Sequence, residues 1–224
     1  MIKFLDILKE NDDNIFIPRG SKEEKDKVLL RRTNDKIQEY IKNGSEGNLD
    51  LRNSPIKFLP RNLTRVGGYL WLDFCENLQS LPNGLKVDGD LDLRFTNITS
   101  LPTDIQVKGD LDLRRSTIES LPSDLEVGGD LVLINSQIEK LPDNLTVNGR
   151  LDLDSCKNLQ SLPNGLKVKN DLDLRDTNIT SLPSDLEVNG ELILYRTPIA
   201  YMYTKEQIRK MVSKVEGTIL LKTW

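Results

Sequence analysis

The sequence of 224 residues contains no histidine and only two cysteines. Without histidine, the chain lacks the commonest general base, a common zinc ligand and every Ser-His-Asp or Cys-His nucleophile. Two cysteines cannot form a four-cysteine metal site or a dense disulfide framework. We therefore expect a protein that is not an enzyme and that has no catalytic residues, no metal site and no cofactor.

Apolar residues and excess positive charge are also scarce. Hydrophobic residues make up 37% of the chain, and no apolar run approaches the length of about 18 residues that spans a membrane. The first ten residues lack the long uncharged stretch of a secretion signal. A net charge of −4 gives no basic field for nucleic acid or lipid. We expect a cytoplasmic protein without direct contact to nucleic acid or membrane.

The sequence is instead rich in one internal repeat. The unit is L-x-L-x-x-[ST]-x-I-x-x-L-P-x-x-L-x-V-x-G-D, as at Leu91–Asp110, and it recurs every 20 or 21 residues. Such a period predicts a solenoid of stacked turns. Repeats 1 to 8 begin at Leu49, Leu70, Leu91, Leu111, Leu131, Leu151, Leu172 and Leu192.

Each part of the unit predicts a local conformation. L-x-L alternation indicates a strand whose leucines share one face. L-P-x-x-L excludes a long helix and favours a short extended or 3₁₀-like segment, because proline removes a backbone donor. The glycine near the end, as in Gly89, Gly109 and Gly149, suits a tight return to the next strand. The leucines, isoleucine and valine should point inward and form the core only when turns stack.

These motifs resemble the leucine-rich repeat family, with Ser or Thr at the usual Asn position and the short L-P segment of bacterial and phage members. The resemblance covers about residues 48–203. It implies an α/β-type solenoid: a leucine-rich repeat array with one parallel sheet, an N-terminal helical cap and a C-terminal helix-strand cap. We assign 1–46 to the N-terminal cap, 47–203 to eight repeats and 204–224 to the C-terminal cap.

The N-terminal cap should be helical. Ser21 and Glu24 form a capping-box pattern, and Gly44 can end the helix that follows. Thr33–Asp35 can divide this stretch into two helices, and a further short helix is expected near Ile2–Leu8. The apolar face of the cap is expected to contain Val28, Leu29, Ile37, Tyr40 and Ile41.

The C-terminal cap should be a helix followed by a strand. Thr204 and Gln207 form a second capping box. Ile208, Met211, Val212 and Val215 then follow at helical spacing, Gly217 is expected to end the helix, and Thr218–Leu221 can add a last strand.

Both cysteines have a structural interpretation. Cys75 and Cys156 occupy the Ser/Thr position of repeats 2 and 6, and a Cys variant at this place is known in the family. They lie four repeats apart, roughly 19 Å at strand spacing, so they cannot form a disulfide with each other. We expect two buried thiols.

The outward side chains of the strands form columns that are mostly Asp and Arg. Such ladders can serve solubility alone, with Asp–Arg pairs on the diagonal offsetting like-charge repulsion. Apolar and aromatic departures from the ladders indicate contact hot spots, unless they only satisfy strand propensity or meet a cap. The candidate partner-binding residues are Tyr69, Trp71, Phe74, Arg94, Phe95, Arg114, Val132, Ile134 and Tyr195.

These observations favour a non-enzymatic protein-binding module that acts through its strand face. It would be a phage or bacterial effector or inhibitor that binds a host protein, monomeric when unbound and placed in the host cytoplasm. One alternative is an acidic-surface inhibitor of a basic, nucleic-acid-handling defence enzyme. The resemblance implies another, an isolated substrate-recognition arm like that of bacterial ubiquitin-ligase effectors. Whether the N-terminal helices or the strand face dominates binding stays open.

Overall fold

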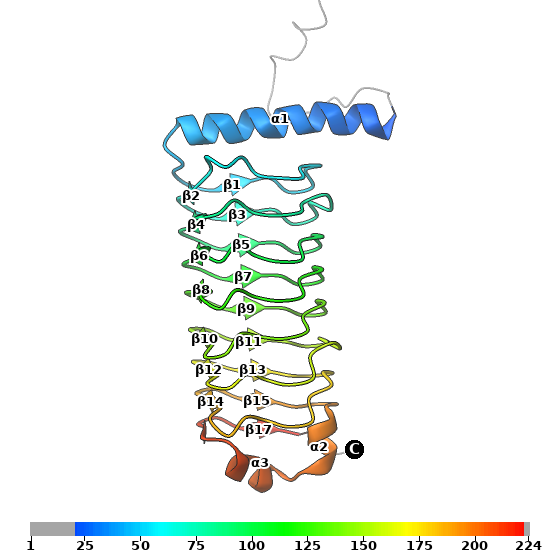
Figure 1. Cartoon of the computed structure of the whole chain (residues 1–224), viewed down its shortest axis with the longest axis vertical. Coiled ribbons are helices and arrows are strands. Elements are labelled where there is room, and N and C mark those ends of the chain that lie inside the picture. Colours follow the sequence, from blue (N-terminus) through cyan, green and yellow to red (C-terminus); the bar gives the residue numbers. More distant parts are fainter. Residues whose placement is uncertain (1–20, 222–224) are drawn as a thin grey trace, which may run out of the picture.

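The computed structural model describes residues 21–221, which form a solenoid of stacked turns (Figure 1). Each turn contributes a two-residue strand to one long parallel sheet, the main sheet. Equivalent leucines pair from turn to turn, as Leu91 does with Leu70 and Leu111, which confirms the predicted period. The nine strands are β1 (Leu49–Asp50), β3 (Leu70–Trp71), β5 (Leu91–Asp92), β7 (Leu111–Asp112), β9 (Leu131–Val132), β11 (Leu151–Asp152), β13 (Leu172–Asp173), β15 (Leu192–Ile193) and β17 (Ile219–Leu220).

The opposite side of the turns also forms parallel ladders, so the prediction of a single sheet was wrong. The L-x-V part of each unit is extended and pairs with the next turn, as Lys108 N does in donating to Val87 O at 3.0 Å. Two four-stranded sheets result. One contains β2 (Arg65–Val66), β4 (Lys86–Val87), β6 (Gln106–Val107) and β8 (Glu126–Val127); the other contains β10 (Thr146–Val147), β12 (Lys167–Val168), β14 (Glu187–Val188) and β16 (Lys214–Val215).

The second side is interrupted between β8 and β10. At this step the side-chain amide of Asn148 donates to Val127 O at 3.0 Å, whereas backbone N–H groups bridge the other turns. A shallow hollow of about 620 Å³ lies beside the interruption. The main sheet continues through the same level, because β9 pairs with both β7 and β11. The register of the strand face is therefore unbroken.

The core consists of ladders of apolar side chains, one from each turn. In repeat 3 all six positions predicted to point inward are buried, and the equivalent side chains of neighbouring turns are buried above and below them. A single turn could not bury this surface, since it needs a neighbour on each side. The thin core explains the low hydrophobic fraction. The six residues are Leu91, Leu93, Ile98, Leu101, Ile105 and Val107.

The glycine and aspartate that end each unit form a second ladder. Asp90 Oδ1 accepts from Asp110 N at 2.9 Å, and Asp110 Oδ1 accepts from Asp130 N at 2.7 Å. A Cβ on Gly109 would lie 2.1 Å from Asp90 Oδ1. The glycine is therefore required by the close approach of the next turn's backbone and carboxylate, and not by a left-handed backbone conformation.

One helix, α1 (Lys22–Lys42), covers the N-terminal end of the stack (Figure 1). Ser21 and Glu24 form the predicted capping box, and the helix is continuous through Thr33, so the predicted division at Thr33–Asp35 was wrong. Only Thr33 and Ile37 of α1 are buried. The N-terminal end of the helix extends beyond the flank of the turns (Figure 1), and Val28 and Leu29 are exposed, contrary to their prediction as cap contacts.

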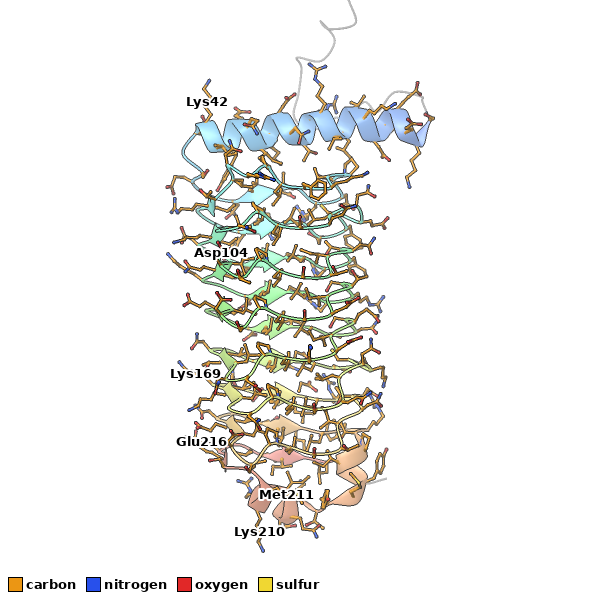
Figure 2. All side chains as sticks on the ribbon, in the orientation of Figure 1. Lys42, Asp104, Lys169, Lys210, Met211 and Glu216 are labelled. Atoms are coloured by element: carbon orange, nitrogen blue, oxygen red, sulfur yellow. The ribbon has the colours of Figure 1, made fainter. Side chains whose placement is uncertain are left out.

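Two short helices cover the other end, where Met211 is labelled in Figure 2. Helix α2 (Pro198–Met202) was not predicted, and α3 (Lys205–Met211) begins with the predicted capping box of Thr204 and Gln207. Helix α3 ends at Met211 and not at Gly217, because Val215 lies in β16 and continues the second-side ladder. The predicted last strand is confirmed as β17. The helix expected near Ile2–Leu8 lies outside the described residues.

Candidate functional site

The candidate site lies on the outer face of the main sheet and on the turn that follows each strand. Parallel pairing places equivalent residues of successive repeats beside one another, with strands about 4.8 Å apart. The structure therefore places two aromatic pairs in repeats 2 and 3, Tyr69 with Trp71 and Phe74 with Phe95. Together with Arg52 and Arg115, which lie over two of these rings, they are called the aromatic cluster below.

The backbone of the turn after each strand is left-handed. The fifth residue of every repeat has a positive φ, from 54° to 61°. Asn, Asp and Gly tolerate this conformation, whereas bulky side chains are strained by about 1 kcal/mol or more. Phe74 and Phe95 occupy it with φ values of 59° and 55°. The eight residues at this position are Asn53, Phe74, Phe95, Arg115, Asn135, Ser155, Asp176 and Arg196.

The strained turns align three side chains into one stack. The rings of Phe74 and Phe95 are 4.5 Å apart with an interplanar angle of 8°, and the Arg115 guanidinium lies 5.5 Å from the centroid of Phe95. Phe74 is 43% exposed. Stacking of this kind contributes about 0.5–1.5 kcal/mol, which offsets part of the backbone strain. The result is a fixed apolar ridge that faces solvent.

A second aromatic pair lies on the strand itself. Tyr69 and Trp71 have ring centroids 5.7 Å apart, and the Arg52 guanidinium lies 5.5 Å from the Trp71 ring. Tyr69 replaces the aspartate that caps the next turn's backbone N–H in repeats 3 to 5, so repeat 2 lacks that hydrogen bond. Tyr69 is 41% exposed. Repeat 2 therefore gives up a stabilising contact and presents an aromatic ring to solvent.

Arginines neutralise the acidic column between the leucines. Arg94 contacts Asp92 at 2.5 Å. The same guanidinium also lies 3.8 Å from the carboxylate of Asp73 and 3.7 Å from that of Asp112. Arg114 also pairs with Asp112. The short contacts run within one strand, two residues apart, and the diagonal contacts are the longer ones. The predicted diagonal pairs are therefore only part of the arrangement. Arg94 and Arg114 both have carboxylate partners within the chain.

A second ionic group occupies repeats 6 and 7 and is called the ionic cluster below. Arg150 contacts Asp152 at 2.8 Å and Asp173 at 2.5 Å, and Arg175 contacts Asp173 at 2.8 Å and Asp154 at 3.4 Å. Asp173 is completely buried under these two arginines. Repeat 6 has exchanged its charges: arginine precedes the strand and aspartate follows it, so the local charge balance is kept.

Two carboxylates are held in an unfavourable environment. Burial, together with the charge of Asp92, raises the pKa of Asp73, whose Oδ1 has no hydrogen-bond partner within residues 21–221. Burial also raises the pKa of Asp152 in the ionic cluster, together with the charge of Asp173. By contrast, the hydrogen bond from Arg52 holds the pKa of Asp50 below its ordinary value. The ionised carboxylate is therefore disfavoured at Asp73 and Asp152 and favoured at Asp50.

The remaining predicted residues lie apart from the aromatic cluster. Val132 and Ile134 are half-buried in repeat 5, where the backbone N–H of Arg115 donates to Ile134 O at 2.9 Å. Two strands, β5 and β7, separate β9 from the Trp71 strand. Tyr195 lies in the last repeat, beside the C-terminal helices, and is half-buried. Ile134 is thus next to the end of the aromatic stack, whereas Tyr195 belongs to a distant part of the face.

The cysteine side chains belong to the core. Cys75 Sγ donates to Leu51 O at 3.1 Å, and Cys156 Sγ donates to Leu133 O at 3.0 Å. Both thiols are buried and unoxidised. Burial raises the pKa of each thiol to about 11. Neither cysteine has the lowered pKa or the exposure that a nucleophile needs.

Sequence reasoning missed Arg52 and Arg115 as members of the aromatic cluster. Both were part of regular charged columns, and only the left-handed turn shows that Arg115 stacks on Phe95. The available signal was positional: bulky residues occupy a place that Asn fills in repeats 1 and 5. Within residues 21–221, no group of three or more Cys, Asp or Glu side chains could hold a metal ion.

No family model and no curated protein sequence matches this chain. Among the described helices, none is both long and apolar enough to cross a membrane.

Proposed function

We propose that the chain is a leucine-rich repeat protein that binds another protein through the aromatic cluster and carries out no chemical reaction itself. An effector or inhibitor that acts on a host protein would work in this way. The observation that carries the proposal is the placement of Phe74 and Phe95 in left-handed turns, where the two rings stack and Phe74 is exposed to solvent while Phe95 is half-buried.

Folding alone does not account for these two phenylalanines. The same turn is formed with Asn53 and Asn135, which fit a positive φ at lower cost, and no side chain at this position is fully buried. Strained, exposed and aromatic residues are typical of binding hot spots. The rigidity of the stack favours binding further, because little side-chain entropy is lost when a partner docks.

The two alternative functions have less support. An acidic-surface inhibitor needs unpaired carboxylates, and in the column between the leucines Asp92, Asp112 and Asp173 are each paired with arginine, which reduces that surface. A ubiquitin-ligase arm would act only together with a separate catalytic domain that carries a reactive cysteine. Cys75 and Cys156 are buried with raised pKa values, so they do not supply that chemistry.

Site-specific photo-crosslinking tests the proposal. The photoreactive residue p-benzoylphenylalanine is placed at Phe74 in one variant and at Phe58 in another, and each variant is irradiated in lysate of the cell of origin. Phe58 is the matched control, since it is a phenylalanine of repeat 1 that is 56% exposed and lies outside the strand face. We expect one dominant protein adduct from position 74 that position 58 does not give.

A second substitution makes the test specific to the stack. Phe95→Asn removes the ring beneath Phe74 while keeping a side chain that suits the turn. The adduct at position 74 should then fall at least about tenfold, which corresponds to the loss of one hot-spot contact. Equal adducts from positions 58 and 74, or an adduct that does not respond to Phe95→Asn, would refute binding through the aromatic cluster.

A further inference from the structure

The stack of the aromatic cluster ends in a cation that has no counter-charge. Arg115 is exposed, lies 5.5 Å from the Phe95 centroid and makes no ion pair within residues 21–221. The other two strand-face arginines nearby are occupied: Arg94 contacts Asp92, Asp73 and Asp112, and Arg114 contacts Asp112. On the far side of Arg115 the turn position is filled by the neutral Asn135.

A partner that covers Phe74 and Phe95 must therefore also cover or approach Arg115. Taking a cation out of water without a compensating charge is strongly unfavourable. A guanidinium that stacks on a ring keeps its N–H donors at its edge, and these match the two oxygens of a carboxylate. The local chemistry thus selects a carboxylate next to apolar side chains.

The geometry of the solenoid sets the spacing of these groups. Phe74, Phe95, Arg115 and Ile134 belong to four successive repeats, with strands about 4.8 Å apart. An extended peptide advances about 3.3 Å per residue, so one that runs along the stack moves from the phenylalanine pair to Arg115 in about two residues. The half-buried Ile134 then lies one or two residues further on.

We infer that the partner presents an extended, mainly apolar peptide to repeats 2 to 5, with one carboxylate on Arg115, an apolar side chain on the Phe74–Phe95 ridge and another on Ile134. This inference rests on the proposed function and names the chemistry of its ligand. A single-stranded nucleic acid also offers negative charge and flat rings, but the array as a whole is acidic, with seven more acidic than basic residues between 47 and 203, which disfavours a polyanion.

Fluorescence anisotropy with labelled peptides tests the inference on the full chain. The probe is a short peptide with Leu-Gly-Glu-Gly-Leu at its centre, so that the three large side chains share one face of an extended chain, compared with the same peptide carrying Lys or Gln in place of Glu. We expect the Glu peptide to bind the wild-type chain at least about tenfold more tightly than the Lys peptide, as for a close charge pair. An oligothymidylate of equal charge should bind more weakly than the Glu peptide.

Two variants test whether Arg115 is the source of the preference for Glu over Lys. Arg115→Asn keeps a residue that suits the left-handed turn and should reduce the preference for Glu over Lys to less than about twofold. Arg196→Asn makes the same substitution at the same turn position in repeat 8, outside the cluster, and should leave the preference unchanged. Thermal unfolding of both variants checks that the solenoid stays folded.

Several results would overturn the inference: no binding of the Glu peptide, equal binding of the Glu and Lys peptides, a preference that survives Arg115→Asn, or tighter binding of the oligothymidylate. These failures are distinguishable from failure of the proposed function. If the crosslink at Phe74 still depends on Phe95 while the peptides show no charge preference, the aromatic cluster binds a protein and only the carboxylate inferred for the partner is wrong.

Discussion

The aromatic cluster in repeats 2 and 3 and the ionic cluster in repeats 6 and 7 occupy equivalent places on one scaffold. The backbone is the same in both: two-residue strands in register, followed by a left-handed turn. Their side chains use that backbone differently. In the ionic cluster Asp173 is completely buried and paired, whereas in the aromatic cluster Phe74 is 43% exposed. The ionic cluster pairs its charges within the chain, whereas the aromatic cluster leaves Phe74 exposed to solvent.

This contrast separates residues that build the solenoid from residues that are free to vary. Gly109 and Gly190, together with the carboxylates of Asp90 and Asp171, are needed for adjacent turns to approach. The residues between and after the leucines lie on the outer face and not in the apolar core, so they can vary where they are not part of a buried ion pair such as that of Asp173. The departures at Tyr69, Trp71, Phe74 and Phe95 are therefore informative about function, because the scaffold does not require them.

The largest effect is expected from substitutions in the glycine-aspartate ladder, and it should be equal in the two halves. A Cβ at Gly109 would lie 2.1 Å from Asp90 Oδ1, and one at Gly190 would lie 2.3 Å from Asp171 Oδ1. Gly109→Ala and Gly190→Ala should each lower the free energy of unfolding by more than about 2 kcal/mol, as for other cases of overpacking. Urea denaturation measures both, and Gly44→Ala is the milder control, because nothing lies near the Cβ and only the left-handed φ of +88° causes strain.

A smaller loss is expected when the ionic cluster loses one cation. Arg175→Met should lower the free energy of unfolding by about 1–3 kcal/mol, because Asp173 stays buried with only Arg150 as its partner. Arg52→Met in the aromatic cluster should cost less than about 1 kcal/mol, since the Arg52–Asp50 pair is solvent-exposed. Equal losses in the two variants would show that the two regions are not differently built.

The dependence of stability on pH should reveal two carboxylates whose ionisation destabilises the fold: Asp73, beside the aromatic cluster, and Asp152, in the ionic cluster. The raised pKa values of Asp73 and Asp152 mean that the folded state binds each proton more tightly than the unfolded state does. Ionisation of these groups therefore removes stability as the pH rises through the folded pKa. Asp73→Asn and Asp152→Asn should raise the melting temperature at pH 7 and have little effect well below the ordinary aspartate pKa of 3.8.

Asp50→Asn is the control of opposite sign. Its lowered pKa means that the ionised form contributes stability above the unfolded pKa, and this contribution is lost as the pH falls through the folded pKa. The substitution should lower the melting temperature at pH 7 and change it little in acid. A gain at pH 7 for Asp50→Asn, or a loss for Asp73→Asn, would contradict the assigned environments.

The smallest effect is expected at the cysteines, one beside each cluster. With pKa values of about 11 and no exposed surface, Cys75 and Cys156 should not react with a thiol reagent at pH 8 while the chain is folded. Both should react at once in denaturant. Rapid modification of either thiol in the native protein would mean that its turn opens locally.

Much of the fold could be predicted because each turn repeats the same physical constraints. Period, inward residues, both capping boxes and the last strand all follow from local patterns. The second-side sheets were missed because L-x-V is too short to show alternation. The prediction for α1 was right about the helix and wrong about part of its apolar face. Apolar spacing could not show that the helix extends beyond the stack and leaves Val28 and Leu29 uncovered.

The candidate site was predicted in composition and not in geometry. Departures from the charged columns identified the four aromatic residues, since each repeat provides the background for the others. The turn conformation aligns Phe74, Phe95 and Arg115. It depends on main-chain φ values, which cannot be read from the spacing of residue types in the sequence. The same limit explains why Tyr195, in a distant repeat, was grouped with residues it does not approach.

The most direct test of the central claim compares stability with binding in the double variant Phe74→Asn/Phe95→Asn. Asparagine relieves the left-handed strain while the stacking energy is lost, so the free energy of unfolding should change by less than about 1 kcal/mol. Binding of the protein that crosslinks at the aromatic cluster should fall at least about a hundredfold, as for two hot-spot residues. A variant that loses stability by several kcal/mol while its folded fraction still binds normally would show that the phenylalanines serve folding and would contradict the account.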